Sequence, residues 1–287
     1  MRVRFPFTAL AILVACAWLG GAQAVPPSVP SFQHVVVIVM ENKAQSDVLG
    51  NRHAPHFNAL ASRYAVLSGY GGVSHPSLPN YLALVSGSTH GIHSDCTSCL
   101  VSGRNLADTL EASGRSWKAY AEGLPSPGFT GAVAGRYAKR HNPFLYFRDI
   151  LAKRARRRRV VPLKQLSADL AANRLPTFSL VVPNVCHDMH DCSVATGDTW
   201  LGRFLKPLLK SPKLSQSAIF VVFDEPPSHE PGTALVPALA LGQLVVPGST
   251  DEDPTSHYGL LRTIEDAWGL PRLGRSAQTL PITGIWR

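Results

Sequence analysis

The chain has 287 residues and a formal net charge of +9, with 28 lysines and arginines against 19 aspartates and glutamates. This length suffices for one large domain or two small ones with a buried core. A basic protein attracts phosphates, nucleic acid and acidic lipid surfaces in general. No nucleic-acid recognition motif accompanies the charge, so we expect no specific nucleic-acid partner.

The N-terminus has the features of a secretory signal. A basic start precedes an apolar run at residues 5–19, and small residues at 22–24 form an A-x-A pattern. We therefore predict that residues 1–24 are a signal peptide cleaved after Ala24, which would place the protein outside the cell or in the periplasm. The alternative is a membrane anchor, which is disfavoured because the apolar run is shorter than the roughly 20 residues that span a bilayer.

Continuous apolar runs rich in β-branched residues predict strands that are buried on both faces, as in a parallel sheet. Three such runs lie at 35–40, 178–182 and 218–223, and a fourth, at 234–241, is interrupted by Pro237. Strands that alternate with helical patterns predict an α/β layered fold. The helical patterns lie at 106–113, 166–172 and 258–268.

Residues 25–287 are predicted to form a single domain, in which the Pro/Gly-containing, basic segment around 124–160 is a candidate cap or insertion over the sheet. Much of the excess positive charge lies in one run at 153–159. This run has two interpretations. One is a solvated loop or helix face, and the other is a contact with an anionic membrane surface.

Four cysteines follow the predicted signal, which itself contains Cys16. An even count in an exported protein predicts two disulfides, and closeness in sequence favours the pairs Cys96–Cys99 and Cys186–Cys192. The alternative is a zinc site at the first pair. It is disfavoured because the second pair lacks the matching C-x-x-C spacing.

Polar side chains follow each of the three strongly apolar runs. Glu41 and Asn42 follow the first, residues 183–191 follow the second, and Asp224 and Glu225 follow the third. Ligands of open α/β sheets bind beyond the carboxyl ends of the strands, where these groups should meet. Their carboxylate and amide oxygens suit a hard divalent cation. Taken singly, each group could instead cap a helix or lie in its first turn.

Ser77 lies in a proline-rich turn at 74–81 that leads into a helical run at 81–86. A hydroxyl held at such a turn can act as a nucleophile if a metal ion lowers its pKa. The alternative is that Ser77 merely caps the helix.

The order of these motifs resembles the bacterial phosphoesterase family that contains secreted acid phosphatases and phospholipases C, a branch of the alkaline-phosphatase-like superfamily. The resemblance implies a three-layer α/β sandwich with a central, mostly parallel sheet. It spans nearly the whole chain after the signal. The stretches that carry it are HVVVIVMEN (34–42), SHPSLPNYLALVSG (74–87), HNPFLYF (141–147), VVPNVCHDMHDC (181–192), FVVFDE (220–225) and HYGLLRTIEDAWGLPRLG (257–274).

The resemblance also implies roles for individual residues. Ser77 matches the nucleophile that forms a phosphoserine, and a histidine such as His187 or His190 would protonate the leaving alcohol. The positions that match metal ligands are Glu41, Asn42, Ser77, Asp224 and Glu225. The positions implied to bind substrate near the phosphate are His75, Asn142, Asp188 and His257, although His257 could equally tether the last helix.

We therefore predict a secreted, metal-dependent acid phosphatase that hydrolyses phosphate monoesters, with phosphoinositides among the candidate substrates. Because a histidine would act as the acid, we expect the activity to have its pH optimum below pH 7. Mg, Mn, Ca, Fe and Zn all remain open as the divalent metal. Three features depart from the family. Pro226 and Pro227 follow the third strand where a Gly-containing loop is expected, the basic run at 153–159 is not part of the family core, and the long cap of the phospholipase branch is absent.

Three alternatives remain at this point. One is a phospholipase C-type phosphodiesterase, and a second is a non-enzymatic secreted protein that binds polyanions. The third is a sulfatase or phosphonate hydrolase. It is disfavoured because the sulfatase pattern Cys/Ser-x-Pro-x-Arg needs an arginine, whereas residues 77–81 end in Tyr81.

Overall fold

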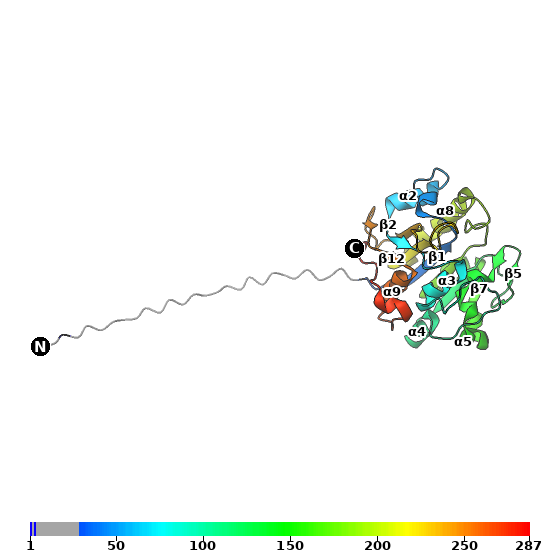
Figure 1. Cartoon of the computed structure of the whole chain (residues 1–287), viewed down its shortest axis with the longest axis horizontal. Helices are drawn as coiled ribbons and strands as arrows, with labels where there is room; N and C mark the ends of the chain where they lie inside the picture. The colour runs from blue at the N-terminus through cyan, green and yellow to red at the C-terminus, as the bar shows by residue number, and fades with distance from the viewer. Residues whose placement is uncertain (2, 4–28) are drawn as a thin grey trace.

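The computed structural model describes residues 1, 3 and 29–287 (Figure 1). Apart from residues 1 and 3, the predicted signal peptide lies outside these described residues. No helix within the described ranges combines the length and the apolar character needed to cross a bilayer.

A large sheet forms the centre of the described chain, with eight strands in the order β11-β2-β10-β9-β1-β8-β4-β7. All neighbouring strands are parallel except where β10 pairs with β9 and β2. The strands are β1 (His34–Met40), β2 (Ala65–Leu67), β4 (Trp117–Ala121), β7 (Val160–Pro162), β8 (Phe178–Val182), β9 (Ser217–Phe223), β10 (Ala238–Leu241) and β11 (Thr250–Asp251). Two small ribbons pair β3 (Tyr70–Gly71) with β12 (Thr255–Ser256) and β5 (Val133–Ala134) with β6 (Tyr137–Ala138).

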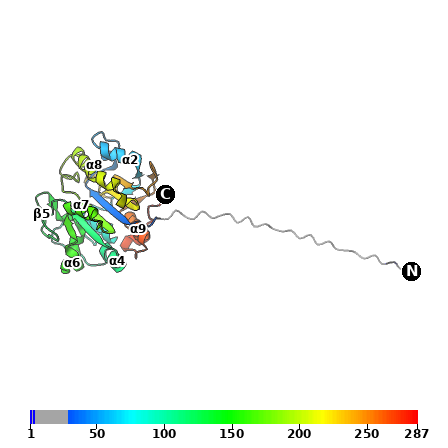
Figure 2. The same cartoon turned by 180° about the vertical axis from the view of Figure 1, so that it is seen from behind.

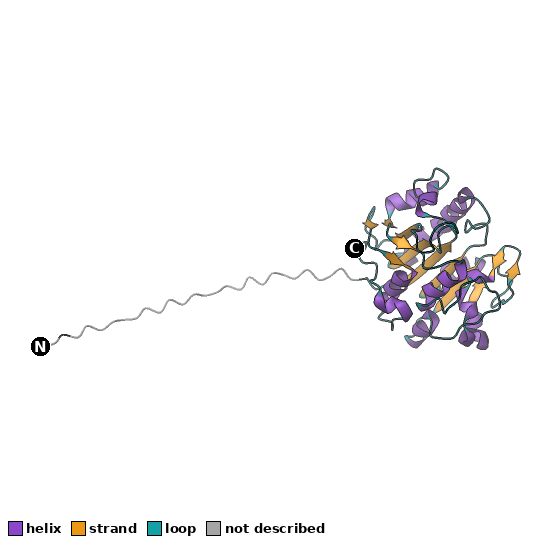
Figure 3. Cartoon of the chain, in the orientation of Figure 1, coloured by secondary structure: helices purple, strands orange, loops and turns teal. Residues whose placement is uncertain are grey.

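Helices cover both faces of the sheet (Figure 3). On one face α3 packs against α9 and α4, and on the other α8 packs against α2 and lies beside α7 (Figure 2). The helices are α1 (Gln45–Val48), α2 (Pro55–Arg63), α3 (Ser77–Ser86), α4 (Leu106–Ala112), α5 (Arg148–Ala152), α6 (Arg154–Arg157), α7 (Lys164–Ala171), α8 (Val194–Lys210) and α9 (His257–Trp268). Short 3₁₀ turns are η1 (Lys139–His141), η2 (Pro143–Tyr146), η3 (Pro212–Leu214) and η4 (Gly274–Gln278).

This arrangement confirms the predicted α/β sandwich with a central, mostly parallel sheet. The central strand β1 is flanked by β9 and β8, and from Val35 to Met40 its side chains are buried. Burial on both faces explains why the strand reads as an uninterrupted apolar run. In register, Met40 pairs with Phe223 and Ile38 pairs with Val181, so all three strands end at the same edge.

Several elements differ from the sequence prediction. Helix α3 begins at Ser77 rather than at Tyr81, because Pro79 lies in the first turn, where a backbone N–H would have no intrahelical acceptor. The fourth strand, β10, begins only at Ala238, directly after Pro237. Helix α8, at 194–210, was not anticipated; it contains Pro207, which weakens the helical signal of the sequence.

The segment 124–160 folds into the β5–β6 ribbon, the turns η1 and η2, and helices α5 and α6, with η1 and η2 contacting α3. Part of the basic run lies within the fold. The guanidinium of Arg156 is nearly buried and forms ion pairs with Asp108, Glu111 and Asp149. Lys153, Arg154 and Arg158 are exposed.

Both predicted disulfides are present. Cys96 and Cys99 have a Cα–Cα distance of 5.7 Å, and Cys186 and Cys192 have one of 4.7 Å. The thiols of the first pair are therefore not available to a zinc ion, as the alternative required.

Candidate active site

The polar groups that follow β1 and β9 meet at the carboxyl edge of the sheet. Because Met40 and Phe223 are paired neighbours, Glu41 and Asp224 leave the two strands side by side. The backbone N–H of Asn42 donates to Asp224 Oδ1 at 3.1 Å. Asn42 has φ +52°, in the left-handed region that asparagine tolerates better than most residues, and this turns the chain directly after the strand. Neither pair of residues begins a helix, so the capping alternative does not hold for them.

Ser77 is the first residue of α3, and its hydroxyl is buried beside Glu41. Ser77 Oγ donates a hydrogen bond to Glu41 Oε2 at 3.0 Å. The N-cap of α3 is Pro76, and no side chain caps this helix. The alternative role of Ser77 as a simple helix cap is therefore wrong, and its hydroxyl is directed at the strand-end carboxylates.

The other oxygen of Glu41 faces a second group of residues. Tyr81 OH donates to Glu41 Oε1, and His141 Nε2 lies 3.4 Å from the same oxygen. The ring of Tyr81 stacks on that of His141, with centroids 5.3 Å apart. His141 Nδ1 lies 3.4 Å from Asp188 Oδ2, so this imidazole stands between two buried carboxylates.

Glu225 is held beside α3 by two partners. Asn80 Nδ2 donates to Glu225 Oε2 at 3.1 Å, and His75 Nδ1 lies 3.0 Å from the same oxygen. The other ring nitrogen of His75 lies 2.9 Å from the carbonyl of Glu230. His75 therefore joins the segment before α3 to the loop after β9.

His257, at the start of α9, is enclosed by protein. Its Nε2 lies 2.6 Å from the Asp224 carbonyl oxygen, which can only accept, so Nε2 carries the proton. Nδ1 then accepts from Tyr70 OH at 2.9 Å. Burial lowers the pKa of His257 to about 4, so the ring is neutral. Both nitrogens are therefore engaged within the protein, Nε2 with the backbone of Asp224 and Nδ1 with Tyr70.

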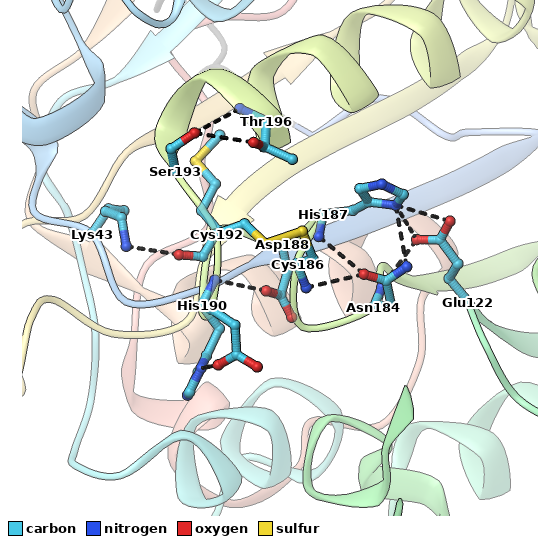
Figure 4. The surroundings of a disulfide bond; sticks show 12 residues. Lys43, Glu122, Asn184, Cys186, His187, Asp188, His190, Cys192, Ser193 and Thr196 are labelled. Carbon is cyan, nitrogen blue, oxygen red and sulfur yellow. Dashed lines mark hydrogen bonds and ion pairs between the residues drawn. A yellow bond between two sulfur atoms is a disulfide. The ribbon is translucent and has the colours of Figure 1, made fainter. Parts of the chain in front are cut away.

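The two histidines of the 183–192 loop point in different directions (Figure 4). His187 Nδ1 lies 2.9 Å from Glu122 Oε2, and its ring stacks on Trp200. His190 lies beside His141, and the centroids of the two rings are 6.0 Å apart. Its Nδ1 is 2.6 Å from Asp191 Oδ1. The contacts of His187 within the described chain thus lie away from Glu41, whereas His190 borders the site.

Burial shifts the pKa values of the clustered groups. It is the main cause that raises the pKa of Asp224 to about 6, of Asp188 to about 7 and of Glu225 to about 9. Burial, followed by the charges of Asp224 and Asp188, raises the pKa of Glu41 well above its usual value. Burial also lowers the pKa of His141, so its neutral, ligand-competent form is favoured.

These groups fit a divalent cation. Several carboxylates share a buried site. Four polar atoms in this site lack a hydrogen-bond partner among the described residues: Asn42 Oδ1, His141 Nε2, Asp188 Oδ2 and Asp224 Oδ2. Ligand atoms of Glu41, His141 and Asp188 lie within 4.8 Å of one another. Such oxygen and imidazole donors are those that divalent metals take in proteins, and a cation would stabilise the ionised carboxylates.

Several site residues were not singled out by sequence reasoning. His141 opens the motif at 141–147 but was passed over for Asn142, whose amide is buried with both polar atoms unpartnered. Tyr81 lies four residues after Ser77, and this spacing places both on one helix face. Tyr70 lies in a strand of two residues and gave no signal.

Comparison with known proteins agrees with this geometry. The chain matches the phosphoesterase family over residues 50–271. It is 36% identical over 283 residues to the phosphatidylinositol-3-phosphatase of Mycobacterium tuberculosis, covering 96% of this chain and 91% of that protein. It is 30% identical over 227 residues to an acid phosphatase of Aspergillus fumigatus, covering 75% of this chain but only 51% of the fungal protein.

Solved structures share the fold at low sequence identity. A protein in the alkaline phosphatase superfamily from Vibrio parahaemolyticus superposes with a TM-score of 0.62 and 14% identity, covering 89% of this chain and 72% of that one. The phosphonate monoester hydrolase of Agrobacterium radiobacter superposes with a TM-score of 0.57 and 14% identity, covering 89% and 79%. The resemblance predicted from the motifs is thus confirmed. The chain belongs to the phosphoesterase family and is a phosphoric ester hydrolase.

Proposed function

We propose that this chain is a secreted, metal-dependent acid phosphatase that hydrolyses phosphate monoesters through a phosphoserine at Ser77. The observation that carries the proposal is the buried hydrogen bond from Ser77 Oγ to Glu41 Oε2. It places a hydroxyl next to carboxylates suited to a cation, at the edge of the sheet where α/β enzymes bind ligands. The relatives named as phosphatases support the same reaction class.

The residues that would hold the metal are those that converge on Ser77. Glu41, Asn42, Asp224 and Glu225 supply oxygens, and His141 and Asp188 extend the donor set beyond Glu41. When bound, a divalent ion would lower the pKa of the serine hydroxyl and polarise the phosphoryl group. Glu41 holds the serine oxygen in place through its hydrogen bond, and Tyr81 holds Glu41.

In this proposal Ser77 Oγ passes its proton to Glu41 Oε2 and attacks phosphorus, the bond to the leaving oxygen breaks, and His190 gives that oxygen a proton. His190 is the better placed of the two predicted acids because it borders His141, and Asp191 orients its ring. Water then attacks the phosphoserine and gives a proton to His190, the bond from phosphorus to Ser77 Oγ breaks, and Glu41 returns the proton to Ser77 Oγ. The unpartnered amide of Asn142 is a donor suited to a phosphoryl oxygen.

Phosphoinositides are the proposed substrate class within the phosphate monoesters, on the support of the mycobacterial relative's name. Secretion or export to the periplasm is proposed from the N-terminal sequence and from the two disulfides, which persist in oxidising compartments.

The test is hydrolysis of p-nitrophenyl phosphate, bis-p-nitrophenyl phosphate, phosphatidylcholine and phosphatidylinositol 3-phosphate by wild type, by Ser77→Ala and by a chelator-treated sample. We expect turnover of the monoesters only, with loss in both treated samples and recovery when metal is restored. Ser86→Ala is the matched control, since this buried serine lies in the same helix and bonds to Leu82 instead. Turnover of the diesters at a similar rate would favour a phospholipase C, and an active Ser77→Ala enzyme would refute the serine mechanism.

A further inference from the structure

The outer face of α8 carries a row of cations. Arg203, Lys206 and Lys210 are exposed, and their spacing of three and four residues places them on one stripe of the helix. None of the ion pairs formed within the described residues involves these three side chains. Their charge therefore remains directed to solvent.

An apolar groove runs along each side of this row. The groove between α7 and α8 has a volume of about 530 Å³ and is lined by Leu170, Trp200 and Phe204 among others. The groove between α2 and α8 has a volume of about 380 Å³ and includes Leu60 and Leu209. No carboxylate lines either groove, whereas Arg63 and Lys213 add further positive charge.

We propose that this α8 face is a docking surface for an anionic phospholipid bilayer. The exposed cations would attract acidic headgroups. The stacked rings of Trp200 and Phe204 are half-buried beside the cations, where amphipathic side chains enter the interface. A soluble polyanion could use the charges but would leave the apolar grooves unfilled, so both features together favour a membrane.

The basic run at 153–159 is the competing membrane contact. Arg156 and Arg159 of this run pair with the acids beneath them, Glu111 in particular, whereas the three cations of α8 form no ion pair within the described residues. The three exposed cations that remain, Lys153, Arg154 and Arg158, supply a matched control for the three on α8.

The experiment compares two triple variants of the full chain, Arg203→Glu/Lys206→Glu/Lys210→Glu and Lys153→Glu/Arg154→Glu/Arg158→Glu. Both change the net charge equally, so general electrostatics is held constant. Co-sedimentation is measured with vesicles of phosphatidylcholine alone and with about one third phosphatidylserine, which supplies the anionic surface. We expect wild type and the 153–159 variant to bind the acidic vesicles, and the α8 variant to bind at least about tenfold more weakly.

Turnover of p-nitrophenyl phosphate and the thermal midpoint should stay at wild-type values in both variants, because these residues contact no site group. Equal loss of vesicle binding in both variants would show that only the net charge of the protein matters, and it would overturn the proposal. Loss in the 153–159 variant alone would transfer the contact there. Wild type could also bind heparin as tightly as it binds the acidic vesicles. That result would identify a site for soluble polyanions and overturn the proposal. None of these outcomes bears on whether Ser77 is the nucleophile.

Discussion

Each carboxylate oxygen of Glu41 faces a different set of residues: Oε2 accepts from Ser77, whereas Oε1 accepts from Tyr81 and lies next to His141. A single side chain thus links the serine to the histidine on the far side of the cluster. Its position depends on the end of β1, which is paired on both sides. The position of Glu41 is therefore fixed by the centre of the sheet.

The hydrogen bond from Tyr70 to His257 should matter for catalysis although neither residue meets substrate. In Tyr70→Phe the ring loses the partner that fixes the tautomer able to donate to the Asp224 carbonyl. We expect metal affinity or turnover to fall about 10- to 100-fold, as for other residues that orient metal ligands. Metal titration and steady-state kinetics would measure the change.

Tyr120→Phe is the control for this prediction, because Tyr120 is also a buried tyrosine and its hydroxyl donates to Asp169 at 2.8 Å. Both variants lose one hydrogen bond, worth about 1 kcal/mol of stability. Equal activity in the two variants would show that Tyr70 has only a structural role.

At the scale of elements, the Cys186–Cys192 disulfide closes the loop that carries Asp188 and His190. Loss of a crosslink across so short a loop should cost about 2 kcal/mol of stability. In Cys186→Ser/Cys192→Ser we also expect reduced activity, because Asp188 would be less well fixed. Urea unfolding and p-nitrophenyl phosphate turnover measure the two effects. Cys96→Ser/Cys99→Ser removes the other disulfide, and a larger loss of activity in that variant would contradict this account.

The C-terminal end of α9 contains a buried carboxyl whose ionisation should make stability depend on pH. Glu265 accepts from Leu273 N at 2.9 Å and from Ser276 Oγ at 2.6 Å, and burial raises its pKa to about 7. Its folded pKa exceeds the unfolded value, so the stabilising contribution is complete below pH 4.5 and is lost as the pH rises through 7.

Glu265→Gln should keep both hydrogen-bond positions and remove this loss. We expect the variant to be more stable than wild type at pH 8, by up to about 3 kcal/mol, and equal to it at pH 4. Urea unfolding at both pH values measures the difference. Glu252→Gln alters an exposed carboxyl and should change neither value. A constant advantage of Glu265→Gln at every pH would point to packing instead of ionisation.

For the whole molecule, metal binding should raise the midpoint temperature of thermal unfolding. A cation that binds only the folded chain stabilises it by mass action, by about 2.7 kcal/mol at one hundred times its dissociation constant. For a chain of this size that amounts to a rise of roughly 5 °C or more in the unfolding midpoint. Scanning calorimetry with and without a chelator would measure it, and Asp224→Asn should abolish most of the shift while Ser86→Ala should keep it.

The buried strands were predictable because strands buried on both faces appear in the sequence as continuous apolar runs. The polar residues that follow these runs therefore indicated where the site lies. The strands 117–121 and 160–162 were missed because they are short and mixed in composition, and only tertiary pairing makes them strands. His141 and Tyr70 could not be assigned from one sequence, since their meaning depends on contacts with residues far along the chain. The orientation of His187 toward Glu122 likewise depends on the path of a loop.

The strands that flank β1 in the sheet lie far from it in the sequence; β9, for example, spans residues 217–223. The pairing that brings Glu41 next to Asp224 is therefore a contact of high sequence separation, which folds slowly because a long loop must close first. During synthesis the first strand emerges long before its partner, so Glu41 and Ser77 are already made while Asp224 and Glu225 are not. A chain shortened before residue 224 would consequently lack Asp224 and Glu225, so the donor set of the site is completed only late in synthesis.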